Sequence, residues 1–224
     1  MLKFTAGDHE LVTSAVARAE ESSDGEIVTI VAEKSDSYHD VGLHYAVLAM
    51  LLVPAGLALA PQSLIDWAMG LFLGWNAVPT RGALMAFLFV KLAAAFLIVR
   101  YALAYMPVRM ALTPGATKSR RVRRRAVELF RVGAERRTVG RTGILLYLSL
   151  RERRAEIVAD EAIHSEVQPE IWGDAMADLV EEVKAGRPGS GMAKAVERIG
   201  AVLAEHFPKS HTDQNELPDR LIEL

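Results

Sequence analysis

The chain has 224 residues, of which 51% are hydrophobic and 24% charged, a formal net charge of −2, and no cysteine. The absence of cysteine excludes disulfides, thiolate metal sites and cysteine nucleophiles. The small net charge hides strong segregation, because residues 1–42 carry 3 basic and 9 acidic side chains, residues 107–154 carry 14 and 3, and residues 155–224 carry 6 and 15. A basic middle between acidic ends does not suit a surface that wraps nucleic acid, so we predict no nucleic-acid partner.

The first 40 residues predict a helix followed by a strand. Residues 1–10 become acidic at once and lack a basic start followed by an apolar run, so we expect no cleavable signal peptide. Apolar side chains then recur at helical spacing, with Thr5 or Asp8 available to cap the helix. After a turn at Asp24-Gly25, Glu26–Ala32 is rich in β-branched residues, as a buried strand would be.

Two long stretches with almost no charge follow. Residues 41–65 contain no Asp, Glu, Lys or Arg, and residues 82–99 contain only Lys91. A helix needs roughly 20 apolar residues to cross a bilayer, so residues 42–60 and 82–105 are candidate crossings. The alternative is a pair of buried helices in a soluble protein. Residues 65–75 are apolar but short and contain Asp66 and two tryptophans, which predicts an interfacial segment, with a third crossing as the lesser alternative.

Basic residues near the two stretches predict their orientation. Only Arg81 lies in the connecting loop, whereas five cations follow the second stretch: Arg100, Arg109, Lys118, Arg120 and Arg121. Positive residues favour the cytoplasmic side, so both termini are expected there. The predicted organisation is a cytoplasmic domain formed by residues 1–40 and 107–224, with residues 41–106 as a transmembrane hairpin in the cytoplasmic membrane.

A basic block beyond the second stretch is the main candidate for lipid contact. Its cations set topology and suit anionic headgroups, each contributing about 1 kcal/mol at the surface; they are Lys118, Arg120, Arg121, Arg123, Arg124 and Arg125. Lys91 is a second polar feature, because a lysine at mid-crossing costs about 2.5–3.5 kcal/mol. It either pairs with Asp66, faces a partner subunit, or reaches the membrane surface, by lying nearer the outer boundary in a helix over residues 86–106 or by extending its amine.

The remainder of the chain alternates helices and strands. Apolar residues line one face of a basic helix, from Val122 to Phe130. Residues 144–150 and 155–160 predict the two strands of a hairpin, and two further helices flank a loop at residues 186–191. Three buried-type strands with helices around them predict an α/β fold, an α/β/α sandwich split by the inserted hairpin. Glu26–Ala32 should then pair with residues 144–150 in one sheet.

Several motifs together resemble the TPM domain family, most closely its bacterial membrane-integral branch. They lie in both soluble pieces: Gly25-Glu-Ile-Val-Thr-Ile-Val31, Ser35-Asp-Ser-Tyr38, Thr142-Gly-Ile-Leu-Leu-Tyr-Leu-Ser-Leu-Arg-Glu-Arg153, Glu156-Ile-Val-Ala-Asp160, His206-Phe-Pro208 and Asn215-Glu-Leu-Pro-Asp219. The resemblance implies an α/β/α sandwich with the hairpin as an insertion. It also implies relatives that act in photosystem repair and assembly, that bind divalent cations, or that are weak acid phosphatases. It transfers no catalytic residue.

Acidic residues at strand ends are the candidate metal ligands. They are Asp24, Glu26, Asp36, Asp160 and Glu161, and their oxygens would suit Ca²⁺ or Mg²⁺ if they converged at one sheet edge. The alternative is that they are solvated caps and turn residues. Histidines lack paired ligand spacing, and no nucleotide-binding or Asp-x-Asp motif is present. The sequence therefore favours a non-catalytic binding or assembly module for other membrane proteins, with a divalent-metal-dependent phosphomonoesterase at the membrane surface as the alternative.

Overall fold

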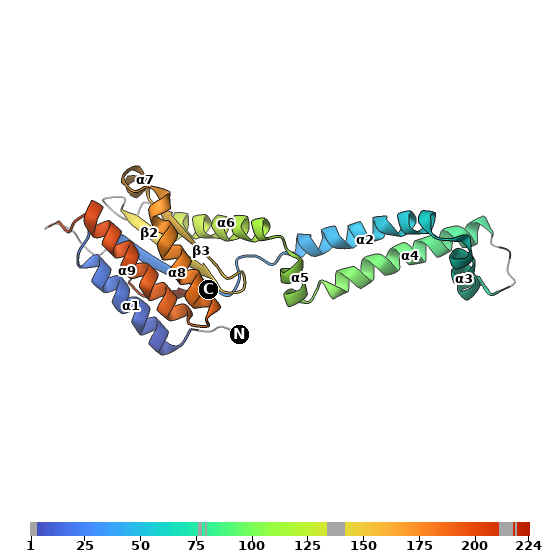
Figure 1. The fold of residues 1–224 in the computed structure, drawn as a ribbon, viewed down its shortest axis with the longest axis horizontal. Helices are drawn as coiled ribbons and strands as arrows, with labels where there is room; N and C mark the ends of the chain where they lie inside the picture. The colour runs from blue at the N-terminus through green and yellow to red at the C-terminus, as the bar shows by residue number, and fades with distance from the viewer. Residues whose placement is uncertain (1–3, 76–77, 79, 134–141, 211–216, 218) are drawn as a thin grey trace. The chain divides into compact units, whose positions relative to one another are not determined.

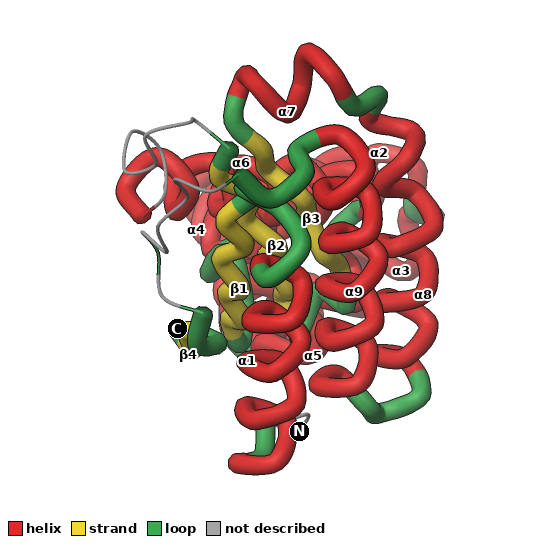
Figure 2. The backbone as a smooth tube through the Cα atoms, turned by 90° about the vertical axis from the view of Figure 1, so that its left-hand side faces the viewer, coloured by secondary structure: helices red, strands yellow, loops and turns green. Residues whose placement is uncertain are grey.

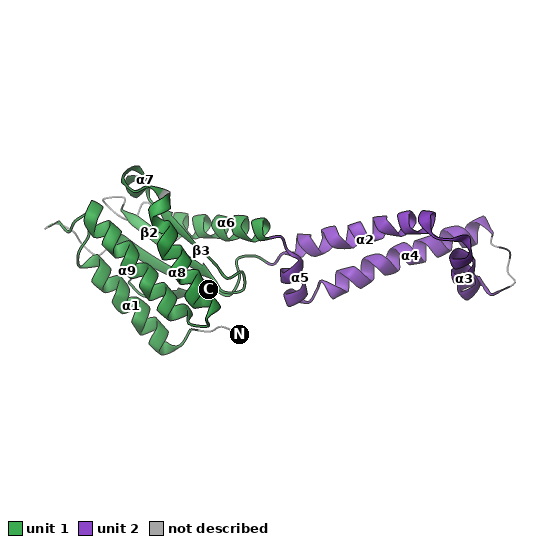
Figure 3. Cartoon of the chain, in the orientation of Figure 1, with its two compact units in different colours: residues 1–36, 115–224 green, residues 37–114 purple. Residues whose placement is uncertain are grey.

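The structure is a computed structural model that describes residues 4–75, 78, 80–133, 142–210, 217 and 219–224. The chain divides into two compact units (Figure 3). Unit 1 combines Met1–Asp36 with Gly115–Leu224, and unit 2 is Ser37–Pro114. Each unit is described by itself.

Unit 1 is built on a four-stranded sheet whose strands come from three distant parts of the chain. The strands are β1 (Glu26–Ala32), β2 (Gly143–Ser149), β3 (Arg154–Ala159) and β4 (Ile222–Glu223), in the order β3-β2-β1-β4 (Figure 2). β1 runs parallel to β2 and β4, and β2 runs antiparallel to β3. The predicted pairing of Glu26–Ala32 with the strand that follows the two apolar stretches is confirmed. β4 has only two residues and was not predicted.

The apolar composition of β1 and β2 explains why they lie at the centre of the sheet. Every residue of β1 and β2 is buried, so both faces of these strands must be covered. β-Branched and leucine side chains fill that environment well, which explains the near-continuous apolar runs in both segments. The predicted bounds of β2 and β3 lie one residue later than the observed ones. Element ends commonly differ by one or two residues between methods of assignment.

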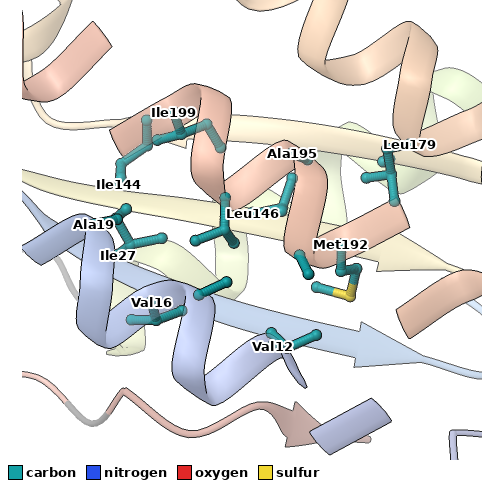
Figure 4. Packing of buried hydrophobic residues seen from close by; sticks show 14 of the residues in the cluster. Val12, Val16, Ala19, Ile27, Ile144, Leu146, Leu179, Met192, Ala195 and Ile199 are labelled. Carbon is teal, nitrogen blue, oxygen red and sulfur yellow. The ribbon is translucent and has the colours of Figure 1, made fainter. Parts of the chain in front are cut away.

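One face of the sheet is covered by α1 (Ala6–Glu20), α8 (Gly173–Lys184) and α9 (Pro188–His206). Figure 1 shows α1 and α9 side by side. Figure 4 shows their buried side chains against the sheet: Val12, Val16 and Ala19 from α1, Met192, Ala195 and Ile199 from α9, and Ile27, Ile144 and Leu146 from the strands. Thr5 and Asp8 form a capping box at the start of α1, so the two alternative caps act together.

The start of α9 differs from the prediction. Residues 186–191 were expected to be a loop, but α9 begins at Pro188 and includes Gly189 and Gly191. The glycines serve close packing here, because a Cβ at Gly189 would lie 2.1 Å from Asp8 Oδ1 and one at Gly191 would lie 2.9 Å from Glu182 Cβ. Glycine-rich composition therefore marks close approach to α1 and α8 at this point rather than a loop.

The opposite face of the sheet is covered by α6 (Gly115–Gly133). Its buried residues Val122, Ala126 and Phe130 pack with Val28 and Tyr147 of the strands. The predicted apolar face of this helix is therefore observed. Between β3 and α8 the chain forms α7 (Glu161–Glu166) and a short 3₁₀ helix, Pro169–Trp172. Unit 1 is thus a mixed α/β fold with helices on both faces of its sheet.

Unit 2 is helical, with α2 (His39–Leu59), α3 (Gln62–Leu73), α4 (Arg81–Ala102) and α5 (Met106–Leu112). α2 and α4 pack against each other, and α2 continues through Pro54. By length and composition, α2 and α4 could each cross a membrane, and only 11% and 6% of their most apolar 18-residue windows are buried. The segment expected at the interface forms α3, which has 12 residues.

Candidate functional site

The predicted acidic residues lie at two opposite ends of the sheet in unit 1. Glu26 opens β1 opposite Gly143, and Asp160 follows the end of β3, whose Ala159 faces Ile144. Because β3 runs antiparallel to its neighbour, its end meets the starts of β1 and β2. Asp24, Glu26, Asp160 and Glu161 therefore belong to one end of the sheet. Asp36 follows the far end of β1, so the five residues do not converge at a single edge.

Each of three acidic side chains at the first end accepts a backbone N–H. Asp24 accepts from Ser210 at 2.7 Å, Glu26 from Leu217 at 3.1 Å, and Asp160 from Gly143 at 3.2 Å. Their main role in the fold is to fasten loops to the start of the sheet. Within the part of the chain that the structure describes, no three His, Asp or Glu side chains are grouped to hold a metal ion. Three of the five predicted ligands thus accept backbone N–H groups, and Asp36 lies at the other end of the sheet.

Glu20, which is not among the predicted site residues, is a strongly perturbed acid at this end. The last residue of α1, it is 7% exposed, and its Oε1 accepts the N–H of Ile27 at 2.7 Å. Burial raises the pKa of the Glu20 carboxyl to about 8; the Ile27 bond opposes the shift, and the charges of Glu26 and Asp219 add to it. The spacing from Val12 and Val16 places Glu20 on the buried face of α1, which was the available signal.

The buried carboxyl of Glu20 has few hydrogen-bond partners. Its Oε2 is buried and has no hydrogen-bond partner among the described residues. Nearby, Lys209 Nζ donates to the backbone oxygen of Glu20 at 2.9 Å rather than to the carboxylate. A neutral carboxyl avoids the cost of a buried charge at this position. The direction of its pKa shift follows from this burial.

At the other end of the sheet, Asp36 meets the basic block. Its Oδ2 accepts from Arg121 at 2.9 Å and from Arg124 at 3.3 Å. Arg123 lies 3.7 Å from Glu156, whose pKa is raised by burial and lowered in part by Arg123 and Arg154. Arg124 and Arg125 also approach Glu128 at 3.6 Å. Several predicted lipid-facing cations therefore stabilise unit 1 itself.

The cations of the basic block differ in the exposure of their side chains. Arg120 is exposed and Lys118 is half-buried. Arg123 and Arg124 keep most of their side-chain surface in solvent, at 71% and 66%, although they form ion pairs. One side of α6 can thus present positive charge while the opposite side packs on the sheet.

In unit 2, Lys91 and Asp66 have separate contacts. Lys91 Nζ lies 5.4 Å from the centroid of the Phe87 ring, a cation–π arrangement one helical turn away. Asp66 Oδ1 accepts from Gln62 Nε2 at 2.8 Å. The described residues show no ion pair between Lys91 and Asp66. Of the three predicted situations of Lys91, pairing with Asp66 is therefore not observed.

Arg109 of α5 is a further polar feature of unit 2, which the sequence predicts only as an orientation signal. It is 3% exposed and donates to the backbone oxygens of Leu103 (2.7 Å), Ala104 (2.9 Å) and Ser37 (2.5 Å), and it contacts His39 Nδ1 at 3.1 Å. One planar guanidinium therefore joins the start of α2 to the turn between α4 and α5.

Comparisons with known proteins support the fold and the family resemblance. The family model described as TPM domain matches residues 106–202. Among solved structures, the NMR structure of the BA42 protein from the psychrophilic bacterium Bizionia argentinensis has a TM-score of 0.56 and 15% sequence identity, covering 99% of this chain and 95% of that one. At that identity the likeness shows the fold alone. Among curated proteins, none matches the chain.

Proposed function

Because residues 106–202 carry a TPM domain, we propose that this chain is an integral protein of the cytoplasmic membrane that presents the domain on the cytoplasmic face. In this proposal unit 2 is a two-helix hairpin inserted into the domain, and the chain belongs to the membrane-integral branch of the family. The domain serves as a non-catalytic binding, assembly or maintenance module for other membrane proteins.

The exposed apolar surface of α2 and α4 is the observation that carries this proposal. Large side chains on both helices are open to the surroundings, for example Leu51 at 60%, Leu52 at 58% and Phe89 at 69%. Helices in the core of a soluble protein would bury such residues, whereas the most apolar windows here are only 11% and 6% buried. Lipid is the environment in which this surface costs least.

The basic residues support the orientation and a lipid contact. Arg100 and Arg109 lie at or beyond the end of α4, and the basic block of α6 follows, whereas Arg81 begins α4. In this proposal the exposed cations of α6 contact anionic headgroups. Lipid, other membrane proteins or a second copy of the chain are then its partners.

Site-directed labelling tests the placement directly, because the chain has no cysteine of its own. We expect Ser63→Cys in α3 to react with a membrane-impermeant maleimide in intact cells, and Ser210→Cys to react only after the membrane is opened. Both positions are exposed in their units, so reactivity reports the side of the membrane. Labelling of both residues in intact cells, or recovery of the chain in the soluble fraction, would overturn the proposal.

A phosphatase assay separates the binding module from the alternative enzyme. The full chain in detergent, supplied with Mg²⁺ or Ca²⁺ and a generic phosphate monoester, should release no phosphate above background. Turnover that falls when Asp24, Asp36 and Asp160 are replaced by Asn would instead establish the metal-dependent phosphomonoesterase. Crosslinking in intact membranes followed by identification of the captured membrane proteins tests the assembly role.

A further inference from the structure

Lys91 is an exposed cation at the middle of α4 in unit 2. Because α4 runs from Arg81 to Ala102, Lys91 lies about 15–17 Å along the axis from each end of the helix. A helix that began at residue 86 would have placed Lys91 within about 8 Å of its start. The observed bounds of α4 therefore do not support a position near the outer boundary of the membrane.

The Lys91 side chain is too short to reach either end of α4. Its stem is about 6 Å long when extended. Lys91 Nζ lies 5.4 Å from the centroid of the Phe87 ring, so the amine leans towards the start of the helix, and Phe87 is itself about 9 Å from Arg81 along the axis. With α4 spanning a hydrocarbon core of about 30 Å, as in the proposed function, the amine remains among the lipid tails.

Unit 2 offers no counter-charge to this amine. Its residues 37–114 include two acids, of which Asp40 lies in the first turn of α2 and Asp66 accepts from Gln62 Nε2 at 2.8 Å. Within the part of the chain that the structure describes, Lys91 forms no ion pair. Charged side chains inside a membrane almost always pair with one another or line the interior of a helix bundle or a cavity. The partner of Lys91 is therefore expected to come from another chain.

The surface around Lys91 has the spacing of a helix-packing seam. Four residues follow one another at intervals of three and four along one side of α4: Lys91, Ala94, Ile98 and Tyr101. Ile98 and Tyr101 are 68% and 72% exposed, and the small Ala94 permits close approach of a neighbouring helix. Figure 1 shows α2 beside α4 and α3 near the start of α4, where a ring of α3 packs on Phe87 with centroids 5.6 Å apart. The seam from Lys91 to Tyr101 lies beyond that contact.

We propose that this seam binds a transmembrane helix of another membrane protein, and that the bound helix carries an Asp or Glu near the middle of the bilayer. The inference rests on the proposed function, because it names the surface and the partner class of the assembly module. Inside lipid, the backbone N–H and C=O groups of the partner are already paired within its own helix, so a side chain has to meet the amine. A carboxylate is the complementary group, since it forms a charge-assisted hydrogen bond with an ammonium.

A second copy of the chain and a lipid headgroup are poorer partners for the seam. A symmetric pair would bring two Lys91 side chains to the same interface, and neither acid of unit 2 lies in the middle of α2 or α4. A lipid phosphate lies in the headgroup layer, outside the hydrocarbon in which the amine remains. The position of the charge thus selects a carboxylate within the bilayer.

Binding of a model transmembrane helix to the full chain in phosphatidylcholine vesicles tests the proposal. The probe is a single-span Leu/Ala peptide with one Asp at its centre, and the reference is the same peptide with Leu there. Energy transfer from the labelled peptide to a dye on Ser63→Cys measures affinity, because the chain has no other cysteine. We expect the Asp probe to bind about tenfold or more tightly than the reference, and Lys91→Leu to lose this preference. Lys91→Glu should instead prefer a probe with a central Lys.

A cation at the same depth on another side of α4 is the matched control. Phe89→Lys in the Lys91→Leu background keeps one central lysine but moves it about 160° around the helix axis, to a position that is 69% exposed. This double variant should not regain the preference for the Asp probe. Ala94→Trp, within the seam, should weaken binding, whereas Ala86→Trp, at an exposed position on another side of α4, should not.

Crosslinking in intact membranes identifies the natural partner. A benzophenone on Ile98→Cys should capture a membrane protein through a transmembrane helix with a central Asp or Glu, located by mass spectrometry of the linked peptide, and Lys91→Leu should abolish this capture. Links only to a second copy, or to helices without a central acid, would overturn the proposal. So would equal binding of the two probes, or an Asp preference that survives in Lys91→Leu or returns with Phe89→Lys. Any of these results in a chain that still labels as membrane-inserted leaves the proposed function standing, whereas recovery of the chain in the soluble fraction would remove both.

Discussion

Glu26 lies directly opposite Gly143 in the parallel ladder of β1 and β2, although all of unit 2 separates them in the sequence. The acid at the start of β1 also accepts the N–H of Leu217, so three distant segments meet at this end of the sheet. The predictions below test the packing and charges that hold these segments and the base of the hairpin in place.

The buried carboxyl of Glu20 should make stability depend on pH. Its pKa of about 8 in the folded chain exceeds the ordinary value of 4.5, so the folded state keeps a proton that the unfolded state loses between these values. Stability is therefore highest below about pH 4.5 for this group and falls as pH rises towards 8. Replacing Glu20 by Gln should flatten this dependence and raise the free energy of unfolding at pH 8.5 by about 2 kcal/mol. Thermal unfolding at pH 6 and 8.5 measures both effects, with the exposed Glu21→Gln as control.

Gly200 should tolerate no side chain. A Cβ at this position would lie 2.5 Å from Ala19 Cβ and 3.1 Å from its Cα, so Gly200→Ala forces α1 and α9 apart. We expect a loss of about 1–3 kcal/mol in the free energy of unfolding, measured by chemical denaturation. Gly173→Ala, where nothing lies within 4 Å of the added Cβ, should be neutral or slightly stabilising. Equal stability of both variants would show that the two helices are not in close contact.

Asp36 should be coupled energetically to Arg121. Their side chains are 20% and 14% exposed, so their ion pair is partly shielded from water. A double-mutant cycle with Asp36→Asn and Arg121→Gln should give a coupling energy of about 1 kcal/mol or more. The cycle between Arg124 and Glu128 is the comparison, because both side chains are more than half exposed and should couple more weakly. A coupling near zero for the first pair would mean that this ion pair does not contribute to holding α6 on unit 1.

Arg109→Lys should loosen the base of unit 2 although it conserves the charge. A lysine cannot reproduce the planar fork that reaches the oxygens of Leu103, Ala104 and Ser37. We expect a lower melting temperature of the full chain in detergent, by several degrees. Arg100→Lys is the control in the same unit, because none of the hydrogen bonds or ion pairs in the described residues involves its side chain. A melting temperature equal to wild type would contradict the role of the fork.

Lys91→Leu tests whether the exposed lysine of α4 faces a partner. Membrane insertion should persist, because the substitution removes a cost of about 2.5–3.5 kcal/mol at mid-helix. Assembly measured by crosslinking and pull-down should weaken if the amine contacts a partner. Phe89→Leu, an exposed apolar change in the same helix, should not alter assembly. If Lys91→Leu captures the same partners as the wild-type chain, the interpretation that remains is that the Lys91 amine reaches towards the membrane surface.

The regular features of the fold could be predicted because they depend on local patterns. Periodicity identified α1, α6 and the strands β1 to β3, and burial on both faces explained why β1 needed β2. β4 could not be found, since two residues carry no periodic signal. The start of α9 was missed because glycines that permit close helix packing resemble a loop in sequence.

The site was harder to predict because it depends on the path of the chain through space. The predicted strand Glu26–Ala32 already separates Glu26 from Asp36, but only the antiparallel pairing of β3 with β2 brings Asp160 to the end where Glu26 lies. Glu20 and Arg109 look like ordinary surface charges until their burial is known.

The split sheet imposes an order on biosynthesis. β1 leaves the ribosome early, yet its edge towards β2 is covered only after residue 149 has been made. Until then its seven buried residues have no sheet to join and remain exposed to aggregation or to chaperones. Unit 1 can therefore complete its sheet only after residues 37–114 have been synthesised, so completion of the sheet reports that the apolar helices have emerged.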